Sequence, residues 1–153
     1  MGLSPFSPEK ASIAAGRLVL EQIENFVVQK ANFGVETTLS GKTYLATLKK
    51  IRAAGYEVRV FFLWVPKVAL SLARIKQRVA SGGHNVPEED VRRRFERCMH
   101  HFFGEYSVLI DGWMLFDNSG DRPRLIAQKT SEELDVIDED LYAAITKRAH
   151  EED

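Results

Sequence analysis

The sequence lacks the features typical of disulfide-bonded, membrane-spanning, secreted or nucleic-acid-binding proteins. Its single cysteine, Cys98, excludes a disulfide within the chain. It has no apolar run of the roughly 18 residues that cross a membrane, and residues 1–6 lack the basic and apolar regions of a signal peptide. Lys+Arg total 21 against 22 Asp+Glu, so composition does not favour nucleic-acid binding. We therefore expect a cytoplasmic protein with no membrane or nucleic-acid partner.

The order of periodic segments predicts an α/β domain. With 153 residues and 44% hydrophobic content, residues 1–153 are expected to form one domain with a sizeable core. Residues 57–65 are almost continuously apolar, as in strands buried in parallel sheets. The turn-rich residues 117–123 predict a hairpin between two strands. Helices are predicted at 7–30, 41–54, 67–80, 87–102 and 138–150, and strands at 32–36, 57–65, 108–117 and 124–129.

Strand 32–36, helix 41–54 and strand 57–65 together predict a βαβ unit, which pairs its two strands in parallel. The expected architecture is thus a parallel sheet between helices, followed by a C-terminal hairpin and a final helix.

The stretch 78–97 is the most distinctive part of the sequence. Gly82-Gly83 separates two predicted helices, and arginines stand at 78, 92–94 and 97. Arginine holds phosphate groups in a fixed fork geometry, so one interpretation is a hinged anion clamp. The alternative is a solvated helix face with ordinary Glu/Arg pairs. Local sequence leaves both open.

Two motifs lie between residues 36 and 43. Ser40-Gly41-Lys42-Thr43 spells the end of a phosphate-binding loop, but the required glycine five residues before Gly41 is Glu36, whose charge would repel phosphate. The string is therefore interpreted as an ordinary helix N-terminus. Glu36, followed by Thr37 and Thr38, is expected either to grip a hydroxylated substrate at the end of a strand or to act as a turn residue.

A metal site is not predicted. Cys98, His100, His101 and His84 do not have the spacing of a four-ligand zinc site. Cys98 has no identifiable paired base, so it is interpreted as a core residue.

Several strings in order along the chain resemble the zeta-toxin-like branch of P-loop kinases. They are Gly2–Glu9 with Ala15–Leu18, Val35–Gly41 with Ala54–Tyr56, Arg78–Pro87 with Arg92–Phe95, and Phe116–Ser119. The resemblance implies a three-layer, parallel-sheet P-loop kinase fold. It also implies an ATP-dependent kinase that uses Mg²⁺ and acts on a small molecule, such as a nucleotide sugar. By the same resemblance, Glu36, Thr37 and Thr38 contact the substrate, and Arg78, His84 and Arg94 face the nucleotide phosphates.

The sequence also departs from the family. The first strand, the P-loop and the catalytic aspartate, which precede the Gly2–Glu9 string in the family, have no counterpart here, so no catalytic residue is assigned. The expected fold is therefore a shortened one with exposed strand edges between 32–36 and 57–65. We expect either that these strands repack next to each other or that a homo-oligomer covers their edges. The alternative function is a non-catalytic domain that binds nucleotides or other anions or has a regulatory role. A third hypothesis is a structural fragment that binds no ligand.

Overall fold

The computed structural model describes the backbone of residues 8–151 and the side chains of residues 14–151. The predicted helix start at Ser7 and most of the Gly2–Glu9 string lie outside the described residues. The chain divides into two compact units, residues 1–37 and 38–153. The assignment of residues 1–153 to one kinase-like domain stays a prediction.

The described part of the first unit is a long helix followed by an irregular segment. Helix α1 spans Pro8–Val28, which confirms the helix predicted there. Lys30, just after α1, adopts a left-handed backbone conformation with φ of 54°. The Phe33 ring stacks on the ring of Phe26 in α1, with the two centroids 5.3 Å apart. The strand predicted at 32–36 is wrong, because residues 31–40 have no regular secondary structure. The turn at Lys30 directs Phe33 back onto α1, and the predicted βαβ unit is not formed.

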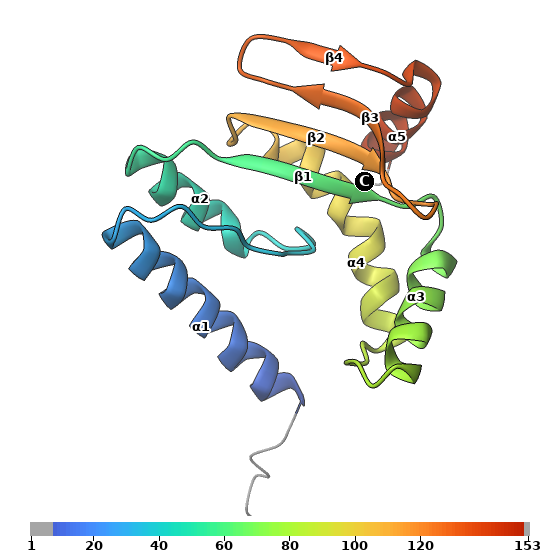
Figure 1. Ribbon diagram of the computed structural model, residues 1–153, viewed down its shortest axis with the longest axis horizontal. Helices are drawn as coiled ribbons and strands as arrows, with labels where there is room; N and C mark the ends of the chain where they lie inside the picture. The colour runs from blue at the N-terminus through green and yellow to red at the C-terminus, as the bar shows by residue number, and fades with distance from the viewer. Residues whose placement is uncertain (1–7, 152–153) are drawn as a thin grey trace, which may run out of the picture. The chain divides into compact units, whose positions relative to one another are not determined.

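The second unit contains a four-stranded mixed sheet in the order β1-β2-β3-β4 (Figure 1). Strands β1 (Arg59–Trp64) and β2 (Gly112–Asp117) are parallel, and β3 (Arg124–Lys129) and β4 (Leu134–Val136) follow antiparallel. The α/β class and the C-terminal hairpin are confirmed. The expectation of a parallel sheet holds only for β1 and β2, since the hairpin and the unpredicted β4 reverse the chain direction.

The helices of the second unit match their predicted positions. They are α2 (Thr43–Ala53), α3 (Val68–Ala80), α4 (Glu88–His101) and α5 (Glu139–Glu151). Helix α4 continues into a π-helical turn, Phe102–Tyr106, which the sequence did not predict. Its wider turn is closed by the Ser107 N–H, which donates to the Phe102 carbonyl at 2.8 Å.

The core lies between one face of this sheet and the helices that pass behind it in Figure 1, α4 and α5. Phe102 and Tyr106 of the π-helical turn, Leu115 of β2 and Ile126 of β3 are completely buried. Burying a large apolar side chain stabilises a fold by about 1.5–3 kcal/mol. The Tyr106 hydroxyl donates to the Gly41 carbonyl at 2.5 Å, which ties this core to the start of α2. In the described part of the chain, no helix combines the length and apolar character needed to cross a membrane.

Candidate anion-binding site

A cavity of about 580 Å³ opens at the carboxyl end of β1. This end of a parallel strand pair is where open α/β sheets bind ligands, and the volume suits a small molecule. Helices α3, α4 and α5 each contribute residues at helical spacing, so each turns one face toward the cavity. The wall consists of Thr38, Phe62, Leu63, Trp64, Val65, Pro66, Ser71, Ile75, Arg78, Val86, Val91, Arg94, Phe95, Cys98, Met99, Leu141, Ala144, Ile145 and Arg148.

The charge of this wall is of one sign. Arg78 from α3, Arg94 from α4 and Arg148 from α5 line it, and none of the described residues that line it is acidic. Guanidinium groups beside an apolar surface attract an anion strongly, because the surroundings screen charge less than bulk water does. The cavity is therefore suited to a ligand with an anionic group and an apolar part.

Arg78 is positioned by the glycine pair that follows α3. The Gly82 N–H donates to Val79 O at 3.0 Å, and the Gly83 N–H donates to Arg78 O at 2.9 Å, which is the Schellman pattern of helix termination. Gly82 has φ of 84°, a conformation that glycine adopts without strain. The Arg78 Nε then donates to the His84 carbonyl at 3.1 Å. The pair predicted as a hinge thus forms a defined helix cap that orients Arg78.

His84 contributes its backbone carbonyl to this arrangement. Its side chain is exposed and is not part of the cavity wall. The predicted contact between the His84 side chain and phosphate therefore has no counterpart in the wall.

The three consecutive arginines of α4 have different surroundings. Arg92 pairs with Glu88 at 2.6 Å, and Arg93 pairs with Asp90, so both engage acidic residues on the helix surface. Arg94 faces the cavity, and its distance to Asp90 is a long 3.9 Å. The solvated-face interpretation therefore holds for Arg92 and Arg93, while Arg94 lines the cavity and its part in an anion clamp stays a prediction.

Arg148 was not identified from the sequence. Its guanidinium lies over the Phe95 ring, 5.5 Å from the centroid, which brings α5 against α4 beside the cavity. The spacing of Leu141, Ala144, Ile145 and Arg148 places them on one face of α5, and this pattern is visible in the sequence. What the sequence could not indicate is that this face meets the same cavity as α3 and α4.

The predicted substrate residues fall on both sides of the boundary between the two units. Glu36 and Thr37 belong to the first unit and are exposed. Thr38 begins the second unit, where it lines the cavity and its hydroxyl lies 2.9 Å from the Ser40 hydroxyl. Glu36 does not end a strand, since residues 31–40 contain none.

Lys42 is engaged in an interaction at the start of α2. Its Nζ lies 2.5 Å from Oε1 of Glu105, which follows α4. The hydrogen bond from Lys42 and the charge of its ammonium lower the pKa of the Glu105 carboxyl, so this carboxyl is ionised at neutral pH. This contact favours the interpretation of Ser40–Thr43 as a helix N-terminus.

Cys98 and the neighbouring histidines form no metal-binding group. Cys98 lines the cavity, and its thiol donates to the Phe95 carbonyl at 3.2 Å. In the part of the chain that the structure describes, no three His, Cys, Asp or Glu side chains converge in a way that would hold a metal ion. Burial lowers the pKa of His101 despite the nearby Glu105 carboxylate, which keeps the imidazole neutral near pH 7.

An ion-pair network lies at the carboxyl end of β2, next to the end of β1. Arg124 pairs with Asp138 at 2.8 Å and with Asp117 at 3.4 Å, and Asp117 also accepts a hydrogen bond from the Ser119 N–H at 2.9 Å. Burial alone would raise the pKa of Asp117, but hydrogen bonds from Ser119 and Arg124 outweigh it and lower that pKa. The string Phe116–Ser119 therefore closes the hairpin through its aspartate.

These observations define an α/β protein with a cavity lined by arginines at the end of a parallel strand pair. The model of the Zeta toxin family matches residues 7–122, about three quarters of the sequence, and the chain belongs to that family. The family is P-loop kinase-like in function and is generally nucleotide-dependent. An uncharacterized protein of Haemophilus influenzae is 35% identical over 95 residues, which cover 62% of this chain and 68% of that protein. No solved structure gives a significant match.

Proposed function

We infer that the chain binds the phosphate groups of a nucleotide in the arginine-lined cavity and belongs to the machinery of an ATP-dependent small-molecule kinase. The observation that carries this proposal is the convergence of Arg78, Arg94 and Arg148 on one wall without a neutralising acid among its described residues. Phosphoryl transfer relies mainly on positioning and charge neutralisation, which are the contributions that such a cluster can make.

The residues present suit the phosphates of ATP. Arginine forks match the oxygen spacing of a phosphate group, and the apolar wall formed by Trp64, Phe95 and Met99 can cover an uncharged part of the ligand. Mg²⁺ is usually held through nucleotide phosphates and one or two carboxylates. We therefore propose that Mg²⁺ is bound mainly through the nucleotide phosphates, and we assign no set of protein ligands to it.

The acceptor of the phosphoryl group is proposed to be a hydroxylated small molecule, of the nucleotide-sugar type that the family resemblance implies. Thr38 supplies a hydroxyl to the cavity wall. For Glu36 and Thr37, which belong to the first unit, the substrate contact implied by the family resemblance stays a proposal. We also propose that the chain forms a homo-oligomer and is located in the cytoplasm.

A second candidate is a non-catalytic anion-binding domain with a regulatory role. It is favoured by Lys42, which lies against Glu105, and by Glu36 at the position where a phosphate-binding loop needs glycine. Both candidates use the same arginines and differ only in turnover.

Calorimetric titration with Mg-ATP tests the proposal through two matched double variants. Arg78→Gln with Arg94→Gln removes two cavity charges, while Arg92→Gln with Arg93→Gln removes the same charge from the outer face of α4. Arg78 is exposed and the Arg94 side chain is 38% exposed, so solvent screening reduces each lost contact to about 1 kcal/mol, and the first variant is expected to bind about 30-fold more weakly. The second should bind nearly as the wild type does. Equal losses in both variants, or no binding by the wild type, would refute the site.

Measured turnover of ATP with a hydroxylated acceptor then separates the two candidates. Phosphate transfer that depends on Arg78 and Arg94 supports the kinase. Binding without transfer supports the regulatory domain.

A further inference from the structure

The segment 38–42, which leads into α2, has an unusual backbone. Leu39 has φ of 49°, in the left-handed region that residues other than glycine rarely adopt. Its side chain is only 7% exposed and belongs to the same core cluster as Phe102 and Tyr106. Strained backbone persists only where its surroundings fix it, and it is concentrated at ligand sites. The residue before Leu39 is Thr38, which lines the arginine-lined cavity.

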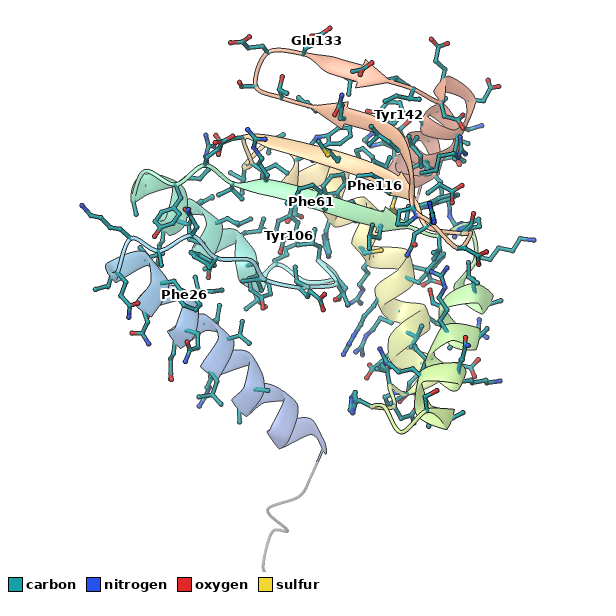
Figure 2. The ribbon with its side chains drawn as sticks, in the orientation of Figure 1. Phe26, Phe61, Tyr106, Phe116, Glu133 and Tyr142 are labelled. Atoms are coloured by element: carbon teal, nitrogen blue, oxygen red, sulfur yellow. The ribbon has the colours of Figure 1, made fainter. Side chains whose placement is uncertain are left out.

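Two consecutive residues of the π-helical turn attach this segment to the core. The Tyr106 hydroxyl donates to the Gly41 carbonyl at 2.5 Å, and Glu105 Oε1 lies 2.5 Å from Lys42 Nζ. Figure 2 shows Tyr106 beside the segment that leads into α2. Burial raises the pKa of the Tyr106 hydroxyl, which therefore keeps the proton that it donates. Because π-helical turns are rare and frequent at functional sites, we looked for a function of this attachment in the neighbouring cavity.

Thr38 presents to this cavity a hydroxyl that can bind an anion. Its Oγ1 lies 2.9 Å from the Ser40 Oγ, and a hydroxyl can accept one hydrogen bond while it donates another. When Ser40 donates to Thr38, the Thr38 proton can be donated to a phosphate oxygen, and the bond from Ser40 strengthens that donation. The hydroxyl thus adds a directional neutral donor to the charge that the three arginines of the wall supply.

We propose that Tyr106 is a positioning residue of the cavity: by holding the Gly41 carbonyl, it keeps the Thr38 hydroxyl at the cavity wall, where that hydroxyl binds a phosphate oxygen of the ligand. Tyr106 does not itself line the cavity, so it acts through the segment 38–42. The inference rests on the proposed nucleotide-binding function and adds to it a contact that the arginines do not make.

A double-mutant cycle between Tyr106→Phe and Thr38→Val tests the proposal by calorimetric titration with Mg-ATP. Tyr106→Phe removes only the buried hydroxyl, and Thr38→Val replaces the cavity hydroxyl by a methyl group. Thr38 is exposed to solvent, so its loss should weaken binding about fivefold, and Tyr106→Phe should weaken binding about threefold to fivefold. The double variant should bind about as weakly as Thr38→Val alone, whereas independent effects would multiply to about 15-fold to 25-fold.

The salt dependence of binding separates this positioning role from a general disturbance of the cavity. Neither substitution removes a charge, so both variants should keep the salt dependence of the wild type, whereas displaced arginines would reduce it. Tyr142→Phe is the matched control, because Tyr142 stacks on Trp113 in the same aromatic core, with ring centroids 6.3 Å apart, and does not line the cavity. It should leave the affinity for Mg-ATP unchanged. Circular dichroism shows that each variant is folded.

The possible results distinguish this inference from the function on which it rests. Unchanged affinity in either single variant, multiplicative losses in the double variant, or an equal loss in Tyr142→Phe would overturn the positioning role and leave the arginine site standing. Absence of Mg-ATP binding by the wild type would instead refute the proposed function, and this inference with it.

Discussion

Replacing Arg148 by glutamine isolates the contribution of α5 to the candidate site. Arg148 lies beyond residues 7–122, the part of the chain that the family model matches, so no family pattern assigns it a role. Glutamine keeps much of the side-chain length and polarity but removes the charge. The structure predicts that the variant folds normally and binds Mg-ATP or inorganic pyrophosphate more weakly.

The expected magnitude follows from the position of Arg148. A hydrogen bond to a charged group contributes about 1.5–3 kcal/mol. Arg148 is substantially exposed, so solvent screening reduces its contribution to about 1 kcal/mol, which is about a fivefold increase in Kd. The variant also loses the contact between the Arg148 guanidinium and the Phe95 ring. This loss should lower the free energy of unfolding by about 0.5 kcal/mol.

The matched control is Lys147→Gln, one residue away on the same helix. It removes the same charge, but Lys147 pairs with Glu151 at 3.6 Å and does not line the cavity. Isothermal titration calorimetry at two salt concentrations measures both variants, because a phosphate contact also changes the salt dependence. If Lys147→Gln weakens binding as much as Arg148→Gln, the effect is one of general charge, and the reasoning about the cavity is refuted.

Three further predictions concern positions around the core. Gly83→Ala would place a Cβ 2.6 Å from Arg78 Cγ and 2.9 Å from Arg78 O, so we expect a several-fold loss of ATP affinity in calorimetry as Arg78 is displaced. Asp111→Ala removes the acceptor of the Val58 N–H at 2.8 Å and should lower the free energy of unfolding in urea by about 2 kcal/mol. Because the folded-state pKa of His101 is lowered, the unfolded chain binds more protons, and stability should fall as the pH drops from about 7.5 to about 5.5.

Each of these predictions has its own control. Gly104→Ala is the match for Gly83→Ala, since an added Cβ at Gly104 meets no atom within 4 Å, and it should leave ATP affinity unchanged. Asp121→Ala, at an exposed turn residue, should change the free energy of unfolding by less than about 0.5 kcal/mol. His101→Gln should flatten the pH dependence of stability, and an unchanged slope would mean that another group is responsible.

The sequence predicted local structure well wherever the pattern was carried by the segment itself. The helical periodicity of 67–80 and 87–102 and the apolar run 57–65 correspond to α3, α4 and β1. The strand predicted at 32–36 was wrong because a strand needs a partner strand. The alternation of two apolar residues within five positions does not show whether such a partner exists. The left-handed turn at Lys30 and the stacking of Phe33 on Phe26 decide that segment, and neither is visible as periodicity.

The candidate site was predictable only in part for a similar reason. The arginine-rich stretch 78–97 was recognisable, but Arg92, Arg93 and Arg94 are equivalent in a sequence and are distinguished only by which helix face meets the cavity. The glycine pair was recognisable as a break, while its function as a Schellman cap that orients Arg78 required the backbone geometry. Arg148 required knowledge of how α5 packs.

The measurement that tests the central claim most directly is an NMR titration of the arginine Nε–Hε signals with Mg-ATP and with pyrophosphate. The account predicts that the signals of Arg78, Arg94 and Arg148 shift with both ligands and saturate together, while those of Arg92 and Arg93 stay nearly unchanged. Shifts confined to Arg92 and Arg93, or no shift at ligand concentrations in the millimolar range, would contradict it.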